Sequence, residues 1–302
     1  MYKFGCIGIG NMGGAVAQAL VQAAGGGSLM VSSRTREKAE AAAARLGCMA
    51  GDNRDLAAQC QYLFLGVKPQ ILPGVLEELA PVLRSRKSPC VLVSMAAGVS
   101  LARLQSLAEG CPVVRIMPNT PVSVGAGLVL YTPGEGLTEE QEAQLTAALA
   151  HAGQVDKLPE PLLDAASAVA GCGPAFACQF LEALADGGVA CGLPREKAYR
   201  YGAQMLLGTA SLLLATGSHP GQLKDAVCSP GGTTIAGVRA LERGGEPVFS
   251  TGGAVLEGLS VEQIASLSRQ WSAFNRRENP SPEEGELEVH DLKKAWSTRL
   301  MS

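Results

Sequence analysis

The first half of the chain alternates short apolar runs with longer helix-forming segments, and this alternation limits the possible folds more than any other feature. Runs rich in β-branched and aromatic residues are followed by segments rich in Ala, Leu, Glu and Gln. Such alternation is typical of βαβ units and a parallel sheet, and fully apolar strands indicate helices on both faces. The predicted strands are residues 3–9, 29–32, 62–67, 91–94, 113–117 and 154–157, and the predicted helices are residues 13–24, 36–46, 71–83 and 101–109.

The pattern changes after Pro159-Glu160-Pro161, where the α/β alternation stops. Residues 162–243 show helical patterns and no convincing strand, and Gly192-Leu193-Pro194 is typical of one helix ending and the next beginning. We therefore predict a Rossmann-like, doubly wound parallel sheet over residues 1–158 and an all-α domain over residues 159–245. Residues 246–302 form a divergent C-terminal tail, in which we expect a helix over 261–274.

Composition narrows the choice of partners and compartment. A net charge of −3 provides no basic surface for nucleic acid. The nine cysteines have no C-x-x-C spacing, so we expect small buried side chains in a reducing compartment and no metal site. Strand-like sequence begins at Lys3, which leaves no room for a signal peptide, and the apolar stretch 205–214 is too short to span a bilayer. These features predict a cytoplasmic protein without a membrane partner.

A glycine-rich turn follows the first predicted strand. Residues 8–13 read GIGNMG, which fits the G-x-G-x-x-G pattern and precedes a helical segment. The pattern alone is weak, but a strand before it and a helix after it are what a dinucleotide fingerprint requires. Glycines allow close approach of the pyrophosphate, and the helix N-terminus offers free N–H groups. The alternative is a tight turn with a purely structural role.

The end of the second predicted strand indicates which dinucleotide is bound. Residues 32–36 read SSRTR, and no acid appears before Glu37. NAD-binding proteins usually place an acid here for the ribose 2′-hydroxyl, whereas a guanidinium suits a 2′-phosphate. We expect NADP(H) to be preferred, with NAD(H) possible. The alternative is a solvated basic helix start.

A second notable segment lies in the helical half and reads SPGGTT at residues 229–234. Ser-Pro is a good helix start, but two glycines in a first turn each cost up to about 1 kcal/mol relative to alanine. Close approach of a ligand to the backbone would explain them, and a helix N-terminus with bare N–H groups suits a carboxylate. An ordinary capped helix is the alternative.

Five motifs occur together and in order along residues 2–245. They are VKPQ (67–70), SMAAGVSL (94–101), RIMPNTPVSVGAG (115–127), GCGPAF (171–176) and SPGGTTIAGVRALERGG (229–245). In combination they resemble the signatures of the pyrroline-5-carboxylate reductase family. The resemblance implies NAD(P)H-dependent reduction of the cyclic imino acid L-1-pyrroline-5-carboxylate to L-proline, by a homodimer or a higher oligomer of dimers.

The resemblance also implies roles for individual residues. The catalytic group would be Thr234, whose hydroxyl would meet the ring nitrogen. The other residues divide between cofactor and substrate. Cofactor-binding residues would be Gly8, Gly10, Asn11, Met12, Gly13, Ser33, Arg34, Val67, Lys68, Pro69, Ala96, Ala97 and Asn119; substrate-binding residues would be Asn119 and, from the second subunit, Ser229, Gly231, Gly232, Thr233 and Thr234.

The chain departs from the family pattern at several points. The family usually has Ser where Cys172 stands, Tyr where Phe176 stands and Thr where Met205 stands. The departures at Cys172 and Phe176 remove hydroxyl groups near the implied site. Residues 246–302 match no Ala- and Glu-rich final helix, which puts the C-terminal end of the dimer in doubt.

The small number of acid–base candidates agrees with imine reduction. There are three histidines, and none has a spacing typical of catalysis. A protonated C=N bond is already electrophilic, so hydride transfer depends mainly on orientation. Two alternatives remain: a β-hydroxyacid dehydrogenase-like enzyme, for which Lys197 and Lys224 are candidate catalytic lysines outside any matching motif, and a catalytically silent NADP-binding sensor.

Overall fold

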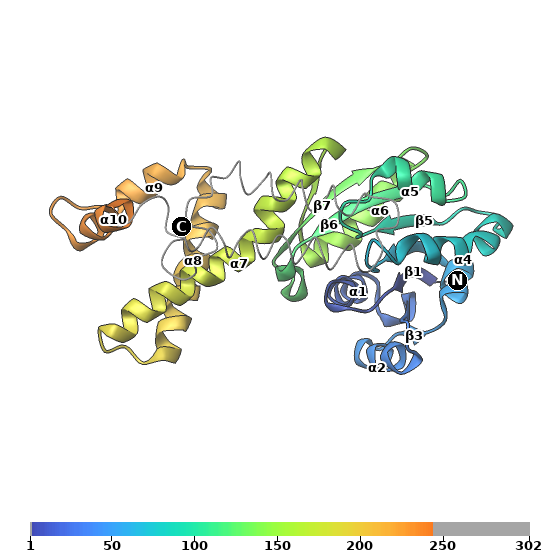
Figure 1. The fold of residues 1–302 in the computed structure, drawn as a ribbon, viewed down its shortest axis with the longest axis horizontal. Coiled ribbons are helices and arrows are strands. Elements are labelled where there is room, and N and C mark those ends of the chain that lie inside the picture. The colour runs from blue at the N-terminus through green and yellow to red at the C-terminus, as the bar shows by residue number, and fades with distance from the viewer. Residues whose placement is uncertain (1, 244–302) are drawn as a thin grey trace, which may run out of the picture. The chain divides into compact units, whose positions relative to one another are not determined.

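The computed structural model describes residues 2–243, which fall into two compact units (Figure 1). The units divide between Pro174 and Ala175, inside one long helix. The first unit contains a β-sheet flanked by helices, and the second contains only helices. The expected α/β fold followed by helices is confirmed. The predicted C-terminal tail, including the helix over 261–274, lies outside the described residues.

An eight-stranded sheet forms the first unit, in the order β3-β2-β1-β4-β5-β6-β7-β8. Its pairs are parallel except for β6 and β7, which run antiparallel. The predicted strands are confirmed, whereas β3 and the antiparallel β7 were not predicted. The strands are β1 (Tyr2–Ile7), β2 (Leu29–Ser32), β3 (Met49–Ala50), β4 (Cys60–Leu65), β5 (Val91–Ser94), β6 (Val113–Pro118), β7 (Gly127–Pro133) and β8 (Gly153–Lys157).

Hydrophobic cores lie on both faces of the sheet, because successive strand residues point to opposite faces. On β1, Phe4 and Cys6 belong to one core and Ile7 to the other. Helices α1, α2 and α6 pack into the first core, and α3, α4 and α5 into the second. The predicted covering of both faces is therefore confirmed. The helices are α1 (Asn11–Ala24), α2 (Arg36–Leu46), α3 (Asn53–Gln59), α4 (Leu72–Ser85), α5 (Leu101–Leu107) and α6 (Glu139–Leu149), with short 3₁₀ turns η1 (Gly26–Ser28), η2 (Thr120–Val124) and η3 (Ala150–Ala152).

Two helices that the periodicity did not indicate, α3 and α6, both begin with a capping box. At α3 the Asp52 carboxylate accepts the Asp55 N–H at 2.8 Å, and the Asp55 carboxylate accepts the Asp52 N–H at 3.3 Å. Thr138 and Gln141 make the reciprocal pair at α6. Because each box satisfies two otherwise free N–H groups, it supports a short helix with a weak apolar pattern.

The helical half comprises α7 (Glu160–Ala190), α8 (Arg195–Thr216), α9 (Pro220–Ala226) and α10 (Thr233–Arg243). The predicted break between α7 and α8 is confirmed: Gly192 has φ +92°, and the Leu193 N–H donates to the Gly188 oxygen at 3.0 Å. A Cβ at Gly202 would lie 2.4 Å from Leu181 Cδ1, so glycine is what allows α8 to approach α7 this closely.

Candidate cofactor and substrate site

The candidate cofactor residues lie at the carboxyl edge of the sheet. β1 pairs with β2 on one side and with β4 on the other, so the direction of chain progression reverses at β1. Ligands of such sheets bind beyond the carboxyl ends of the strands at this switch point. The turns after β1, β2, β4, β5 and β6 carry every cofactor residue implied by the sequence. Tertiary structure thus brings together segments spread over residues 8–119.

Two glycines of the turn are required by the packing of the turn itself. Gly8 has φ +93°, and a Cβ there would lie 2.7 Å from the Gly66 oxygen. A Cβ at Gly13 would lie 2.0 Å from the Gly8 oxygen. The backbone of the β1–α1 turn also bonds its neighbours, with Gly8 N–H donating to the Ser32 oxygen at 3.0 Å. These glycines let α1 start directly against the strand ends.

Gly10 differs, because nothing lies within 4 Å of the Cβ that it lacks and its φ of −83° suits any residue. It is the N-cap of α1, where no side chain accepts a hydrogen bond and no acid occupies the first turn. The helix therefore presents free N–H groups and positive partial charge toward open space. Packing gives no reason for glycine here, whereas close approach of a phosphate does.

Sequence reasoning missed Gly66, which follows β4 as Gly8 follows β1. A Cβ at Gly66 would lie 2.7 Å from the Gly8 oxygen and 3.1 Å from Met95 Cε. The Gly66 N–H donates to the Ile7 oxygen at 2.8 Å. A glycine directly after a predicted strand was the available signal. Its absent side chain keeps the β1 and β4 turns in contact at the switch point.

At the end of β2, the two arginines have different surroundings. Arg36 donates from Nε to the Glu40 carboxylate at 2.8 Å, and this bond raises its pKa. Arg34 is exposed and has no ion pair within residues 2–243. The buried Ser32 hydroxyl donates to the Asn53 side-chain oxygen at 2.7 Å, whereas the neighbouring Ser33 is half-buried at the surface. Arg34 is thus the guanidinium available to a phosphate.

The remaining loops at this edge differ in exposure. Lys68 is exposed and its carbonyl accepts the Ile71 N–H at 2.9 Å, so its backbone starts the turn into α4. Val67 and Pro69 are half-buried. After β5, Ala96 is buried, and its N–H donates to the Ser94 hydroxyl at 3.3 Å, while Ala97 is half-buried.

Asn119, immediately after β6, makes two hydrogen bonds within the protein. Its side-chain oxygen accepts the Leu128 N–H at 2.9 Å, and its side-chain nitrogen donates to the Ala170 oxygen on α7 at 3.1 Å. Each polar atom of the carboxamide thus makes one bond within the first unit, and one N–H and one oxygen lone pair remain. This arrangement indicates a residue that fixes the β6–β7 turn against α7.

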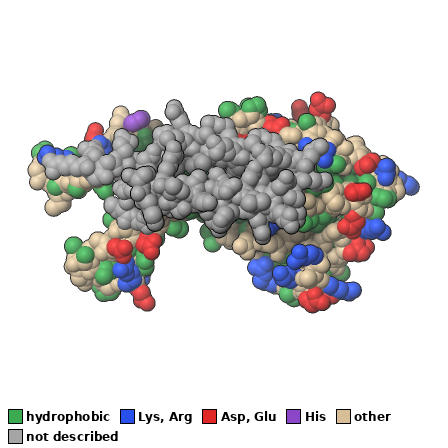
Figure 2. All heavy atoms as spheres, in the orientation of Figure 1, with side chains coloured by type: hydrophobic (Ala, Val, Ile, Leu, Met, Phe, Trp, Pro, Cys, Tyr) green, Lys and Arg blue, Asp and Glu red, His purple; other side chains and the backbone are tan. Residues whose placement is uncertain are grey.

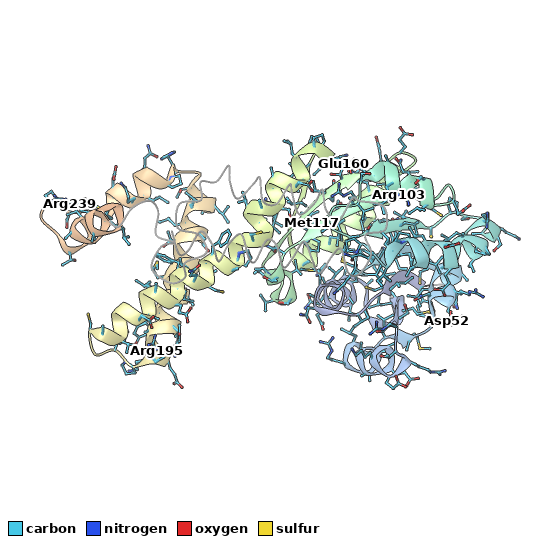
Figure 3. The ribbon with its side chains drawn as sticks, viewed as in Figure 1. Asp52, Arg103, Met117, Glu160, Arg195 and Arg239 are labelled. Atoms are coloured by element: carbon cyan, nitrogen blue, oxygen red, sulfur yellow. The ribbon has the colours of Figure 1, made fainter. Side chains whose placement is uncertain are left out.

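A buried ion pair also anchors α7 to the sheet. Arg115 on β6 has a side chain 6% exposed, and its Nη1 lies 2.6 Å from the Glu160 carboxylate. Glu160 is labelled in Figure 3 and stands at the start of α7. The same carboxylate oxygen accepts the Leu101 N–H at 2.7 Å, which caps α5. Asp164 lies 3.7 Å from Nη2. One carboxylate thus connects three elements, and nothing in the sequence pattern indicated this connection.

The SPGG segment before α10 forms a turn, so the predicted Ser-Pro helix start is wrong. The Gly232 N–H donates to the Ser229 oxygen at 3.0 Å, and Gly231 has φ +69°. Proline followed by a positive-φ glycine is the pattern of a type II turn. The helix begins at Thr233, and the Gly232 carbonyl accepts the Ala236 N–H at 3.4 Å as an N-cap residue does.

Of the two glycines in this turn, Gly231 has a local reason for being glycine, whereas Gly232 is opposed mainly by the Ser229 hydroxyl, a side-chain end that can rotate. Gly231 adopts a left-handed φ, and a Cβ at Gly232 would lie 2.3 Å from Ser229 Oγ. The hydroxyls of Ser229, Thr233 and Thr234 are exposed. The first turn of α10 contains no acidic side chain.

The cysteine prediction is only partly correct. Cys6, Cys60, Cys90 and Cys111 are buried in the first unit, as expected. The three on α7 and after it, Cys172, Cys178 and Cys191, are exposed. Met205 on α8 is also exposed, at 41%. The described residues contain no group of His, Cys, Asp and Glu arranged to hold a metal ion.

Comparison with known proteins assigns two separate segments of the chain to known families. Residues 3–98 match the family described as NADP oxidoreductase, coenzyme F420-dependent. Residues 160–263 match the family described as pyrroline-5-carboxylate reductase dimerisation. The fold, the glycine turn and these matches define an NADP-dependent oxidoreductase with a helical dimerisation region.

Individual relatives identify the family. The chain is 39% identical to a pyrroline-5-carboxylate reductase of Escherichia coli over 274 residues. This aligned region covers 88% of this chain and 98% of that protein. The crystal structure of a pyrroline carboxylate reductase of Plasmodium falciparum with NADP bound has a TM-score of 0.76 at 26% identity. The match covers 91% of this chain and 98% of that one. A pyrroline-5-carboxylate reductase structure from Coxiella burnetii has a TM-score of 0.78 at 27% identity, and the match covers 92% of this chain and 99% of that one. The chain belongs to the pyrroline-5-carboxylate reductase family.

Proposed function

We propose that this protein reduces L-1-pyrroline-5-carboxylate to L-proline with NADPH, the last step of proline biosynthesis. The observation that carries the proposal is the 39% identity to the Escherichia coli reductase over 98% of that protein's length. The test is to incubate the purified chain with NADPH and the imino acid, following NADPH absorbance and measuring proline by chromatography. Equimolar NADPH loss and proline formation support the proposal; NADPH loss without proline contradicts it.

For the cofactor, the proposal assigns the pyrophosphate to the α1 N-terminus and the 2′-phosphate to Arg34. The uncapped, acid-free start of α1 and the open space at Gly10 support the first assignment. The unpaired exposed guanidinium of Arg34 supports the second, because phosphate and guanidinium form charge-assisted bidentate bonds. NADH, which has no 2′-phosphate, then binds more weakly but still has the pyrophosphate site. The remaining contacts come from Asn11, Met12, Gly13, Ser33, Val67, Lys68, Pro69, Ala96 and Ala97.

The substrate site, as we propose it, is the SPGG turn and the first turn of α10. Backbone N–H groups of Gly231, Thr233 and Thr234 bind the substrate carboxylate beside Gly232, whose own N–H is bonded to the Ser229 oxygen. The Thr234 hydroxyl bonds the ring nitrogen. The exposure of these hydroxyls and the absence of an acidic side chain from the first turn of α10 support this assignment. NADPH supplies the hydride when bound, and the protein's residues orient the imine carbon and hold the proton on nitrogen. Asn119 contributes to both the cofactor and the substrate side of the site: one N–H and one oxygen lone pair of its carboxamide are used within the protein, and the second N–H and lone pair serve the ligands.

We propose a homodimer, or a higher oligomer of dimers, in which a second subunit covers the helical half. α8 buries only Ala198 and Gly202, while Leu207, Leu212 and Leu214 are 60%, 51% and 77% exposed. Apolar surface of this extent is typical of an interaction site. We further propose that residues 159–245 form the dimerisation domain.

Covering by a second subunit also accounts for the exposed apolar surface of α7. Within residues 2–243, this is the one helix that is long and apolar enough to cross a membrane. Only 11% of its most apolar window is buried in the single chain. Its first turn is tied to the sheet by Glu160, and Pro174 lies near its middle. We therefore propose that a partner subunit, not lipid, covers it and that the enzyme is cytoplasmic.

Acidic and basic side chains are interspersed on the visible face of the first unit (Figure 2), which supports the absence of a nucleic-acid partner.

A further inference from the structure

Two cysteines lie side by side at the amino edge of the sheet, opposite the edge that carries the glycine turn. β5 and β6 pair in parallel with Leu92 opposite Val113, and the Leu92 N–H donates to the Pro112 oxygen at 2.8 Å. Continuing this register by two residues toward the amino ends places Cys90 opposite Cys111. Directly opposite residues on neighbouring strands have Cα atoms about 5 Å apart, within the range that a disulfide spans.

The side chains of this pair lie together in the same core. Both belong to the core on the α3–α4–α5 face, with Cys90 fully buried and Cys111 6% exposed. The two thiols form a side-chain hydrogen bond with each other, which lowers the pKa of Cys111 to about 7 and raises that of Cys90. The pair therefore consists of one sulfur that becomes a thiolate easily and one that keeps its proton.

A cation stands beside the pair and adds to this effect. The Arg86 guanidinium, held by bonds to the Ser88 and Ala57 carbonyl oxygens, lowers the pKa of both thiols. An adjacent arginine is a recognised feature of reactive cysteines, because the thiolate is the nucleophile. At the other buried cysteines of the first unit burial dominates: it raises the pKa of Cys6 and of Cys60 to about 12, although Arg86 also acts on Cys60 in the lowering direction.

We propose that Cys90 and Cys111 form a modification site at which a hydroperoxide converts the two thiols into an intrachain disulfide. The Cys111 thiolate attacks one peroxide oxygen, the O–O bond breaks, and Cys111 becomes a sulfenic acid while hydroxide leaves and takes a proton. The Cys90 thiol then attacks the Cys111 sulfur, forming the S–S bond and releasing water. Two electrons pass from the two sulfurs to the peroxide, and the thiol protons end in the water formed.

Peptide mapping of the intact wild-type protein tests this site. Trypsin cleaves after Lys87, Arg103 and Arg115, so Cys90 falls in peptide 88–103 and Cys111 in peptide 104–115. The folded protein is treated with a small molar excess of hydrogen peroxide, alkylated, digested and analysed by mass spectrometry, with and without dithiothreitol. We expect the two peptides to appear linked, lighter by two hydrogen atoms than their sum, and to separate on reduction.

Cys6 and Cys48 supply a matched control within the same molecule, because they lie near each other without the cation or the thiol hydrogen bond. They fall in peptides 4–34 and 46–54, and we expect at least tenfold less of their linked form. The proposal is overturned if peptides 88–103 and 104–115 remain separate, whether alkylated or as sulfinic acids. Equal linkage of the Cys6 and Cys48 peptides also overturns it, as does linkage of Cys90 to Cys60 instead.

Discussion

Replacing Gly10 with alanine separates the two explanations for the glycine-rich turn. The added Cβ meets nothing within 4 Å, and φ is −83°, so the folded protein accommodates it. Reduced entropy of the unfolded chain favours Gly10→Ala by about 0.4–1 kcal/mol, while alanine is worse than glycine at an N-cap by about 1 kcal/mol. These effects nearly cancel, so we expect the melting temperature to stay within roughly 4 °C of the wild type.

NADPH binding should nevertheless weaken strongly in Gly10→Ala. A methyl group at the α1 N-terminus holds the pyrophosphate away from the free N–H groups, and each bond to a charged group that is lost costs about 1.5–3 kcal/mol. The dissociation constant measured by titration calorimetry should rise at least about tenfold.

Two alanine controls make the comparison decisive. Gly13→Ala places a Cβ 2.0 Å from the Gly8 oxygen, so it should lower stability by about 1–3 kcal/mol as well as weaken NADPH binding. Gly27→Ala, at the exposed turn before β2, has open space and should change neither quantity. If Gly10→Ala binds NADPH as tightly as Gly27→Ala does, the close-approach reasoning is refuted.

Three further substitutions test other parts of the proposed site and its support. Arg34→Asp should raise the NADPH KM about 10- to 100-fold and shift the cofactor preference toward NADH. The control Arg36→Asp breaks only the surface pair with Glu40 and should do neither. Equal NADPH/NADH ratios of kcat/KM in the two variants contradict the 2′-phosphate assignment. Thr234→Ala should lower kcat/KM for the imino acid with NADPH affinity unchanged, and Thr234→Ser should be milder; equal losses point to packing by the methyl group. Glu160→Ala should lower stability by about 3 kcal/mol because it leaves the Arg115 guanidinium buried without its closest partner, and an unchanged melting temperature contradicts that account.

The cofactor side of the site was largely predictable from sequence, because its determinants are short and local. A strand, a glycine turn and a helix start occupy about a dozen consecutive residues, and the SSRTR run lies at the end of the next strand. The loops carrying Val67 and Ala96 were assigned through family resemblance. The structure places these loops at one edge of the sheet but does not itself assign their contacts with a cofactor.

Local appearance was misleading in the SPGG segment. Ser-Pro before a helical pattern looks like an N-cap and a first turn, but the chain forms a separate turn at Gly231 and starts the helix at Thr233. The reason is that proline suits both the first position of a helix and the second position of a type II turn. The φ of the following glycine decides between them, and the residue type does not reveal its sign.

What the sequence by itself determined was the order of six of the eight strands and of the four helices α1, α2, α4 and α5, the glycine turn and the helical character of residues 159–243. Each depends on hydrophobic periodicity or on residues adjacent in the chain. Tertiary structure decided the antiparallel β7, the contact of Gly66 with Gly8, the Arg115–Glu160 ion pair and the meeting of Cys90 with Cys111. These pairings join residues up to 58 positions apart. Local periodicity carries no information about which distant strands become neighbours, since that choice depends on how the whole sheet buries its two faces.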